Sequence, residues 1–431
     1  MTRATKDSGV EWIGQIPERW HLTRIAGLYN LRNTKVSDKD FPALSVTNKG
    51  ILPQLETAAK TNAGDNRKLV CIGDFAINSR SDRRGSCGIS PYNGSVSLIN
   101  LVLTPRSKTI PKYFDWLFHT VQFADEFYRW GHGIVDDLWS TGWEEMKKIL
   151  VPLPPLPEQQ AIADYLDDKC AQIDNITATI NEQIEVLKQY KKSVITEAVT
   201  KGLDPNAPMK DSGVEWIGQI PEKWEIEKIK YISKLKGRIG WQGLTSSEYM
   251  EEGPYLITGT DFIDGKINWK TCTHISNERW EQAAEIKIKN GDLLITKDGS
   301  VGKVAIVDNL TEKASLNSGV LKIILNEKII QTKYLFWVLL SDVFWHWFAL
   351  KNAGNSTIIH LYQSDFSEFK FICPTLPEQQ AIADYLDDKC AQIDAVVADK
   401  QAQLETLAAY KKSLIYEYVT GKKSVPGFEE A

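Results

Sequence analysis

The segment LPEQQAIADYLDDKCAQID occupies residues 156–174 and recurs letter for letter at residues 376–394. A second repeat precedes each variable part of the chain: KDSGVEWIGQIPERW at residues 6–20 returns as KDSGVEWIGQIPEKW at residues 210–224. The offsets between copies, 376 − 156 = 220 and 210 − 6 = 204, are far longer than the period of a solenoid, roughly 20–50 residues. The sequence therefore predicts two related halves arranged about an approximate two-fold axis.

An apolar heptad follows each LPEQQ, which favours a long coiled-coil helix over an ordinary surface helix. Pro157 and Pro377 suit the first helical turn. We expect the two helices to pair with each other, although each could instead pack on its own domain as a helical hairpin. Lys400 interrupts the second heptad. The predicted seam consists of Leu166, Ile173, Ile180, Leu187, Val194, Leu386, Ile393, Leu404, Leu407 and Leu414, with Ile162, Ile176, Ile184 and Val396 on the same face.

The regions between the repeats have diverged but keep a common outline. Short β-rich runs such as FAINS, DLLITK and VLKIIL are separated by glycine, asparagine and serine, which predicts mixed α/β domains. Gly73-Asp74 before one such run is echoed by Gly291-Asp292 before another. The apolar stretch at residues 334–350 is short for a membrane span and carries Asp342, so we expect one buried helix there and no membrane contact.

Composition excludes several classes of protein. The chain has 431 residues, of which 42% are hydrophobic and 25% charged, so it is not wholly disordered. Its formal net charge of −5 excludes a uniformly basic nucleic-acid coat protein, and any contact with nucleic acid must come from local patches. Six cysteines form no CxxC pair, and the first residues lack an apolar signal stretch. A cytoplasmic, reduced protein is expected.

No catalytic constellation can be found in the sequence. There is no complete phosphate-binding GxxxxGK[ST] loop, no HExxH and no histidine pair at metal-ligand spacing. Neither Cys71 nor Cys87 has a histidine placed to activate it. We therefore expect a binding protein without a metal, a bound cofactor or catalytic residues of its own.

Polar and basic loops that follow strands remain as candidate binding residues. Arginine offers a planar fork for guanine edges or phosphates, while serine and asparagine add adaptable hydrogen bonds. Asp82 and Asp298 inside these loops could orient a neighbouring cation or accept from a cytosine amine. A solvated turn is the plain alternative for about half of these residues. The candidates are Arg80, Ser81, Arg83, Arg84, Lys236, Arg238, Trp241, Gln242, Lys297, Ser300, Lys303, Asn352, Asn355, Thr357, His360 and Tyr362.

At this point the chain resembles the specificity (S) subunit of a type I restriction–modification system. The resemblance rests on DSGVEWIGQIPE-[RK]-W before each variable region and on LPEQQAIADYLD with its heptad helix after it, and it covers essentially the whole chain. It implies conserved segments at residues 1–20 and 205–224, target recognition domains at 21–155 and 225–375, conserved helices at 156–204 and 376–423, and a tail at 424–431.

The resemblance also implies a function. Each recognition domain would read one half of a bipartite, asymmetric site on double-stranded DNA. The helices would form an antiparallel coiled coil that spaces the domains and docks two methyltransferase (M) subunits, which restriction (R) subunits then join. Catalysis, S-adenosylmethionine, ATP and Mg²⁺ would belong to these partners.

Three alternatives stay open. An orphan recognition scaffold that serves methylation alone would have the same sequence features. A self-contained nuclease or methyltransferase is disfavoured by the missing motifs. A purely structural coiled-coil adaptor would leave the two large divergent domains unexplained.

Overall fold

The computed structural model describes residues 3–54, 64–107, 109–133, 139–238, 243–353 and 360–428. The chain folds into two compact units, unit 1 with residues 1–181 and 401–431 and unit 2 with residues 182–400. Each unit contains one variable region, called domain 1 (residues 21–155) or domain 2 (residues 225–375), and parts of the two long helices α5 (Leu156–Lys201) and α11 (Leu376–Val419). The predicted mixed α/β class with internal duplication is confirmed.

Domain 1 is built on a four-stranded antiparallel sheet with the order β10-β9-β12-β4. Its side chains alternate between two cores: Phe75 and Ile77 enter one, and Ala76 enters the other. The second sheet of the domain has three strands in the order β11-β8-β5. The strands of these two sheets are β4 (Tyr29–Arg32), β5 (Lys35–Val36), β8 (Arg67–Val70), β9 (Phe75–Asn78), β10 (Cys87–Ile89), β11 (Gly94–Val96) and β12 (Asn100–Pro105).

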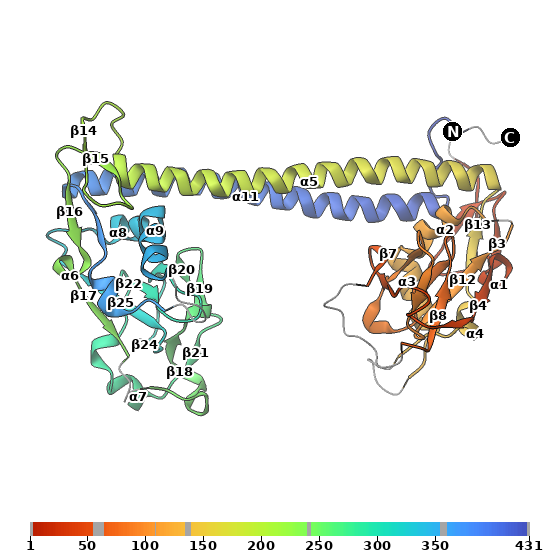
Figure 1. Cartoon of the computed structure of the whole chain (residues 1–431), viewed down its shortest axis with the longest axis horizontal. Helices are drawn as coiled ribbons and strands as arrows, with labels where there is room; N and C mark the ends of the chain where they lie inside the picture. Colours follow the sequence, from red (N-terminus) through yellow and green to blue (C-terminus); the bar gives the residue numbers. More distant parts are fainter. Residues whose placement is uncertain are drawn as a thin grey trace. The chain divides into compact units, whose positions relative to one another are not determined.

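The rest of unit 1 consists of short helices and strand pairs (Figure 1). The strand pairs are β1 (Thr5–Asp7) with β2 (Gln15–Pro17), β3 (His21–Arg24) with β13 (Leu150–Leu153), and β6 (Leu44–Thr47) with β7 (Gly50–Pro53). The helices are α1 (Ile25–Leu28), α2 (Pro111–Phe118), α3 (Val121–Arg129), α4 (Trp143–Met146) and the 3₁₀ turn η1 (Ser81–Arg83).

Domain 2 repeats the main sheet of domain 1, now as β23-β22-β25-β17. Leu293 and Ile295 enter one core while Leu294 enters another, the same alternation as in domain 1. Its second sheet, β21-β18-β24, contains the parallel pair β18–β24. The strands of these sheets are β17 (Ser233–Gly237), β18 (Met250–Ile257), β21 (Thr273–His274), β22 (Leu293–Thr296), β23 (Val304–Ile306), β24 (Ala314–Leu316) and β25 (Val320–Leu325).

The remaining elements of unit 2 follow the order seen in unit 1 with additions. The strand pairs are β14 (Met209–Asp211) with β15 (Gln219–Pro221), β16 (Glu225–Lys228) with β26 (Lys370–Cys373), and β19 (Phe262–Ile263) with β20 (Lys266–Ile267). The helices are α6 (Ile229–Ile232), α7 (Asn277–Glu281), α8 (Thr332–Leu340), α9 (Asp342–Lys351) and α10 (Gln363–Ser367), with 3₁₀ turns η4 (Ser246–Glu248), η5 (Gly259–Asp261) and η6 (Ala284–Ile286).

The apolar stretch at residues 334–350 differs from its expectation. It is divided between α8 and α9, because Ser341 adopts an extended backbone (ψ 164°) between them. Both helices are buried on one side, through Tyr334 and Val338 in α8 and Phe344 in α9. Within the described ranges, none of the helices combines the length and the apolar character that a membrane span requires.

Within each unit the α5 and α11 segments run antiparallel. In unit 1, Asp174 pairs with Lys411 at 2.5 Å and the Tyr165 ring lies 4.6 Å from the Tyr418 ring. In unit 2, Lys191 pairs with Asp394 at 2.6 Å, and Lys400 Nζ donates to Gln183 Oε1 at 2.6 Å. The residue number in α11 falls as the number in α5 rises, which defines the antiparallel register.

The seam side chains repeat at alternating three- and four-residue intervals along both helices. Ile176 and Val396 were expected on this face but are 49% and 44% exposed, because they lie one position beside the heptad positions. Lys400 stands where α5 has Ile180, and it is half-buried. Buried seam residues are Leu166, Ile173, Ile180, Val194, Leu386, Ile393 and Leu414, and half-buried ones are Leu187, Leu404 and Leu407.

Candidate DNA interface and its attachment to the helices

The Gly-Asp turn in domain 1 starts the central strand β9. Gly73 has φ +87°, a conformation that favours glycine, and Asp74 accepts a hydrogen bond from the Cys71 backbone N–H at 2.8 Å. The same buried carboxylate pairs with Arg32 of β4 at 2.7 Å. The turn therefore has a structural role. It fixes the start of β9, and β9 leads to the loop at its other end.

The Gly-Asp turn in domain 2 has the same geometry with a different cation. Gly291 has φ +90°, and Asp292 accepts from the Lys289 backbone N–H at 2.8 Å. Its ion-pair partner is Lys322 of β25, at 2.6 Å, so the cation comes from another strand than in domain 1. The motif explains why β22 begins where β9 does in the repeated sheet.

Two loops meet at the far end of the central strand in domain 1. The strand-end loop (residues 79–86) follows β9, and the return loop (residues 139–142) leads into α4. The Thr141 N–H donates to the Ser79 carbonyl at 2.9 Å, the Ser81 N–H donates to the Trp139 carbonyl at 3.0 Å, and Arg80 and Ser140 form a β-bridge. Two chain segments some 60 residues apart thus present their side chains together.

The equivalent loops also meet in domain 2. The strand-end loop (residues 297–303) follows β22, the return loop (residues 360–362) leads into α10, and the Leu361 N–H donates to the Lys297 carbonyl at 2.9 Å. His360 Nδ1 lies 2.7 Å from Asp298 Oδ1, and Lys297 lies 3.1 Å from the same carboxylate. Burial raises the pKa of Asp298, but the hydrogen bonds from His360 and Lys297 outweigh it and hold that pKa below its ordinary value.

A cavity of about 180 Å³ opens beside these loops in domain 2. Four of the predicted residues border it, namely Arg238, Lys297, His360 and Tyr362, together with Asp298. Arg238 is 6% exposed, and its guanidinium donates to the Leu316 carbonyl at 2.7 Å and the Ser315 hydroxyl at 3.0 Å. The side chain of Arg238 is therefore held in the wall, whereas Tyr362 is 58% exposed and available to a ligand.

The other predicted residues of domain 1 lie on the strand-end loop. Arg80 is exposed, and Ser81 opens the 3₁₀ turn η1. The Arg83 side chain is 67% exposed and lies 3.6 Å from Asp82. Arg84 pairs with Asp125 of α3 and lies 5.7 Å above the Tyr128 ring. Its positive charge is therefore partly neutralised within the domain.

The remaining predicted residues of domain 2 do not gather at the cavity. Lys236 pairs with Glu285 at 2.8 Å, and Lys303 Nζ donates to the Gly259 carbonyl at 3.2 Å. Asn352 donates to the Phe348 carbonyl at 2.8 Å, which is a helix-end contact, and the Ser300 carbonyl accepts from Thr296. Trp241, Gln242, Asn355 and Thr357 lie outside the described residues.

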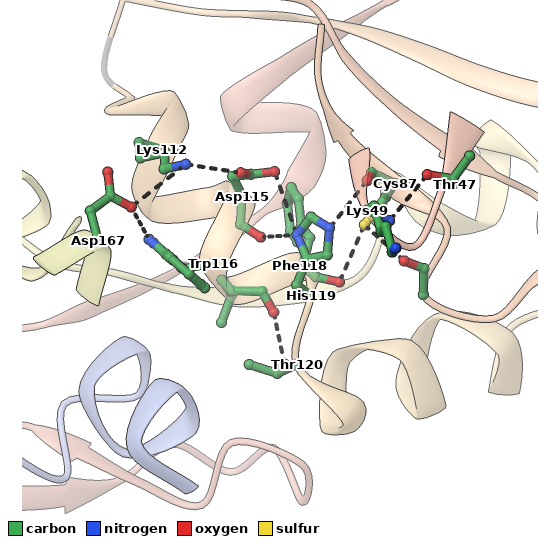
Figure 2. A network of polar contacts seen from close by, with 12 residues as sticks. Thr47, Lys49, Cys87, Lys112, Asp115, Trp116, Phe118, His119, Thr120 and Asp167 are labelled. Carbon is green, nitrogen blue, oxygen red and sulfur yellow. Dashed lines mark hydrogen bonds and ion pairs between the residues drawn. The ribbon is translucent and has the colours of Figure 1, made fainter. Parts of the chain in front are cut away.

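A polar network in domain 1 fixes the strand that follows the strand-end loop (Figure 2). His119 at the end of α2 bridges the Asp115 carbonyl at 2.7 Å and the Cys87 carbonyl at 3.1 Å. Burial raises the pKa of the Cys87 thiol well above its ordinary value, so this cysteine stays a neutral core residue. The network ties β10 to α2, and α2 in turn contacts the long helix.

An indole-carboxylate contact joins each domain to its long helix. In unit 1 the Trp116 Nε1–H donates to Asp167 at 2.8 Å, and Lys112 lies 3.6 Å from the same carboxylate, as Figure 2 shows. In unit 2 the Trp337 Nε1–H donates to Asp387 at 3.0 Å. Lys333 pairs with that carboxylate as well. The aspartates are equivalent positions of the exact repeat, so both domains are attached in the same way.

The glutamate of each LPEQQ holds the other constant segment. The Trp20 Nε1–H donates to Glu158 at 2.8 Å, and the Trp224 Nε1–H donates to Glu378 at 3.0 Å. These contacts bind the repeated segments at residues 6–20 and 210–224 to the starts of α5 and α11. The repetition of both motifs, with Trp20 and Trp224 at the same place in each copy, indicated a shared role for these residues, but the sequence did not show that they contact each other.

The first glutamine of each LPEQQ joins the helix to the domain. Gln159 accepts from the Ile110 backbone N–H at 2.9 Å, just before α2, and Gln379 accepts from the Gln331 backbone N–H at 2.8 Å, just before α8. Each amide also donates to a proline carbonyl, that of Pro154 or Pro374, at 2.8 Å. The motif therefore fixes where α2 and α8 begin.

Within the described residues, no group of three or more histidine, cysteine, aspartate or glutamate side chains could hold a metal ion. Ser140 and the return loop of domain 1 were not selected from the sequence. Aligning the two halves at the 220-residue offset places Ser140 against His360, and this signal could have found them.

Comparison with known proteins gives a consistent result. The model of the type I restriction modification DNA specificity domain matches residues 17–186 and again residues 221–406. A specificity subunit of the type I restriction enzyme MjaVIII from Methanocaldococcus jannaschii is 26% identical, over 95% of this chain and 94% of its own. The EcoBI specificity subunit of Escherichia coli is 27% identical, over 58% of this chain and 53% of its own.

Two solved structures share the fold. A chain from a structure described as the basis of complex assembly and conformational transition of the type I R-M system has a TM-score of 0.72 and 15% identity, over 95% of this chain and 99% of that one. The HsdS subunit from Thermoanaerobacter tengcongensis has a TM-score of 0.53 and 16% identity, over 95% of this chain and 98% of that one.

Proposed function

Because the chain belongs to the type I restriction–modification DNA specificity family, we propose that domains 1 and 2 each read one half of a bipartite, asymmetric site on double-stranded DNA. The chain is a type I specificity subunit with two recognition domains. The observation that carries the proposal is the double family match around two domains that keep one sheet order while their polar loops differ. Because their loop side chains differ, we expect the two domains to read different half-sites.

We assign the helix pair a spacing role. α5 has 46 residues and α11 has 44, and antiparallel ion pairs join them in both units. A helix of this length measures about 70 Å at 1.5 Å per residue, and paired helices resist bending in a way that a flexible linker does not. Such a spacer fixes the number of unread base pairs between the two half-sites.

The helix pair also offers a docking surface in duplicate. Ile176 and Tyr410 of unit 1 are exposed, as are Val396 and Tyr190 of unit 2, and each pair lies at one level of the antiparallel register. The two pairs are repeats of each other at the 220-residue offset. We propose that each pair contacts one of two methyltransferase subunits, which restriction subunits then join. S-adenosylmethionine, ATP and Mg²⁺ are assigned to these partners and no catalytic step to this chain.

Co-expression with the cognate methyltransferase tests the reading role. Genome-wide mapping of N6-methyladenine should give a split motif, and replacing residues 21–150 by the same region of another family member should change one half of it. A methylated motif that is an unbroken palindrome, or a swap that changes both halves, would contradict the proposal. A methylation pattern that does not depend on this chain would contradict it as well.

Shortening the helices tests the spacing role. Deleting residues 178–184 from α5 and 400–406 from α11 removes one matched heptad and preserves the seam register. The loss of about 10 Å corresponds to roughly three base pairs, so the unread gap in the motif should shorten by that amount. An unaltered gap with normal methylation would remove the helices from this role.

Charge substitutions test the docking surface. Tyr190→Glu and Tyr410→Glu should each lower the methyltransferase content of the complex from two copies to one, measured by native mass spectrometry. Glu185→Lys, at another exposed position of α5, is the matched control and should leave two copies. Two copies in both tyrosine variants would place the docking surface elsewhere.

A further inference from the structure

The two domains retain one main-chain contact at the end of the central strand. In domain 1 the Thr141 N–H donates to the Ser79 carbonyl, and in domain 2 the Leu361 N–H donates to the Lys297 carbonyl, both at 2.9 Å, an ordinary length for a backbone hydrogen bond. The donors are offset by 361 − 141 = 220 residues and the acceptors by 297 − 79 = 218. The strand-end loop and the return loop are therefore equivalent structures in the two domains.

The side chains next to this contact differ between the domains. Arg80 and Ser140 form a backbone bridge in domain 1, and the residues at the same places in domain 2 are Asp298 and His360. The latter two are joined through their side chains, with His360 Nδ1 2.7 Å from Asp298 Oδ1. A shared backbone thus carries an arginine with a serine in one copy, and a histidine with an aspartate in the other.

We propose that this position is where each domain discriminates a base, through Arg80 in domain 1 and His360 in domain 2. The proposal rests on the proposed function, in which both domains read DNA. Arginine matches the two acceptors of guanine in the major groove. Asp298 engages Nδ1 of His360, which leaves Nε2 as the nitrogen that meets a base edge, and Asp298 is accordingly a positioning residue.

The surroundings of His360 fit contact with a base. Lys297 and Tyr362 border the same cavity of about 180 Å³, and the Tyr362 ring lies 5.8 Å from the His360 ring. Tyr362 is 58% exposed and offers an aromatic face, while Lys297 pairs with the same Asp298 carboxylate as His360, at 3.1 Å. Arg238 is buried against the backbone behind them and supports the wall.

The test uses the full chain co-expressed with its methyltransferase, mapped for N6-methyladenine in host DNA. His360→Gln should relax one base position in the half read by domain 2, and Arg80→Gln one position in the other half. Asp298→Asn should relax the same position as His360→Gln, but less. His346→Gln, an exposed histidine on α9, and Arg24→Gln, an exposed arginine on β3, are the matched controls and should leave the motif unchanged.

Competition binding of the purified complex makes the result quantitative. Duplexes that carry each of the four bases at every position of the half-site give a table of penalties, each being the loss of binding affinity that a wrong base causes at that position. His360→Gln should reduce the penalty at one position about tenfold and leave the others unchanged. A uniform loss at all positions, or an unaltered table, would overturn the proposal. If His360→Gln does not assemble, Asp298→Asn in the same assay decides by the same criterion.

This outcome can be separated from the proposed function. When exchange of residues 21–150 changes one half of the motif while Arg80→Gln and His360→Gln change nothing, the domains read DNA and only this assignment falls. When the exchange itself changes neither half, the reading role falls first.

Discussion

Domains 1 and 2 differ most in the loops that follow the central strand and least where each domain contacts the long helices. Trp116 and Trp337 both donate to an aspartate of the long helix, and the four-stranded sheets have the same order. In contrast, Arg80 of the strand-end loop in domain 1 has Asp298 at its place in domain 2. The parallel pair β18–β24 of domain 2 extends over three residue pairs, whereas in domain 1 the equivalent parallel contact is a single bridge between Ala43 and Ser95 of β11.

The difference separates two kinds of constraint on a duplicated chain. Each domain attaches to an identical stretch of helix, so a changed attachment residue in one copy would lose a partner that the helix still presents. The strand-end and return loops keep their shared backbone contact in both copies, while the side chains that they carry differ. Attachment residues therefore report common structure, whereas the proposed DNA-reading residues lie in the loops whose side chains differ.

The largest effect on stability should come from removing Trp20 or Trp224, the tryptophans that donate to the glutamate of each LPEQQ. Trp20→Ala and Trp224→Ala each delete a buried indole and should lower the stability of the adjoining domain by about 3–5 kcal/mol. Trp20→Ala should cost more, because Glu158 is buried and Glu378 is exposed. Hydrogen exchange of β12 for domain 1 and β25 for domain 2 measures each domain separately.

The phenylalanine variants sharpen this comparison. Trp20→Phe and Trp224→Phe keep most of the apolar volume and remove the indole N–H, so each should cost about 1 kcal/mol. An equal loss of exchange protection in both domains from a single variant would show that the two domains do not unfold independently.

A gain in stability is expected at the position where the seams of the two helices differ. Lys400→Ile places an apolar side chain at the seam position that Ile180 fills in the first copy, and it should stabilise unit 2 by about 1–2 kcal/mol. Lys192→Ile, at an exposed position of the same unit, is the control and should give no gain. Slower hydrogen exchange in α11 checks the effect, and faster exchange would show that the lysine and Gln183 hold the register.

A smaller effect should distinguish the two indole-carboxylate contacts. Asp387→Ala leaves the buried N–H of Trp337 without its acceptor and should destabilise domain 2 by about 1 kcal/mol. Asp167→Ala should cost less, because Trp116 is only half-buried and its N–H can reach water. Exchange in α2 and α8 measures both, and a larger effect in α2 would contradict this ranking.

The smallest effect concerns a charge cluster that domain 2 has at an exposed position. Hydrogen bonds from Lys228 and Lys230 lower the pKa of Glu368 to about 2. A depressed carboxyl pKa stabilises the fold above its ordinary value near 4.5 and loses that contribution as the pH falls toward 2. Wild type and Glu368→Gln should therefore differ slightly in domain 2 at pH 7 and converge as the pH drops below 4.5.

Much of the fold could be predicted from the sequence because it is encoded in repetition and periodicity. The heptad from Leu166 to Val194 requires an apolar partner, and the second copy supplies one. Short β-rich runs such as FAINS, separated by glycine, asparagine and serine, indicated the central strands. The break at Ser341 was missed, because a continuous apolar run gives no sign of a change in backbone direction.

The candidate interface could be predicted only in part. Basic residues in a loop after a strand were visible, and Lys297, His360 and Tyr362 proved to border one cavity. Arg238 had the same sequence character, but its guanidinium is buried against the Leu316 carbonyl. Whether a cation faces solvent or the backbone depends on which distant segment folds over it, and residue type does not carry that information.

By itself the sequence determined that the chain is duplicated and predicted long heptad helices and mixed α/β variable regions, because each of these follows from local pattern or exact repeats. It favoured pairing of the two helices but left open that each packs on its own domain, and the contacts between α5 and α11 decided between these alternatives. The tertiary structure decided which loops share a surface. Ser79 and Thr141, or Lys297 and Leu361, are about 60 residues apart and meet through single backbone hydrogen bonds. Such contacts form only once the strands of the sheet have paired in the folded domain. The spacing of residues along the chain therefore does not predict them.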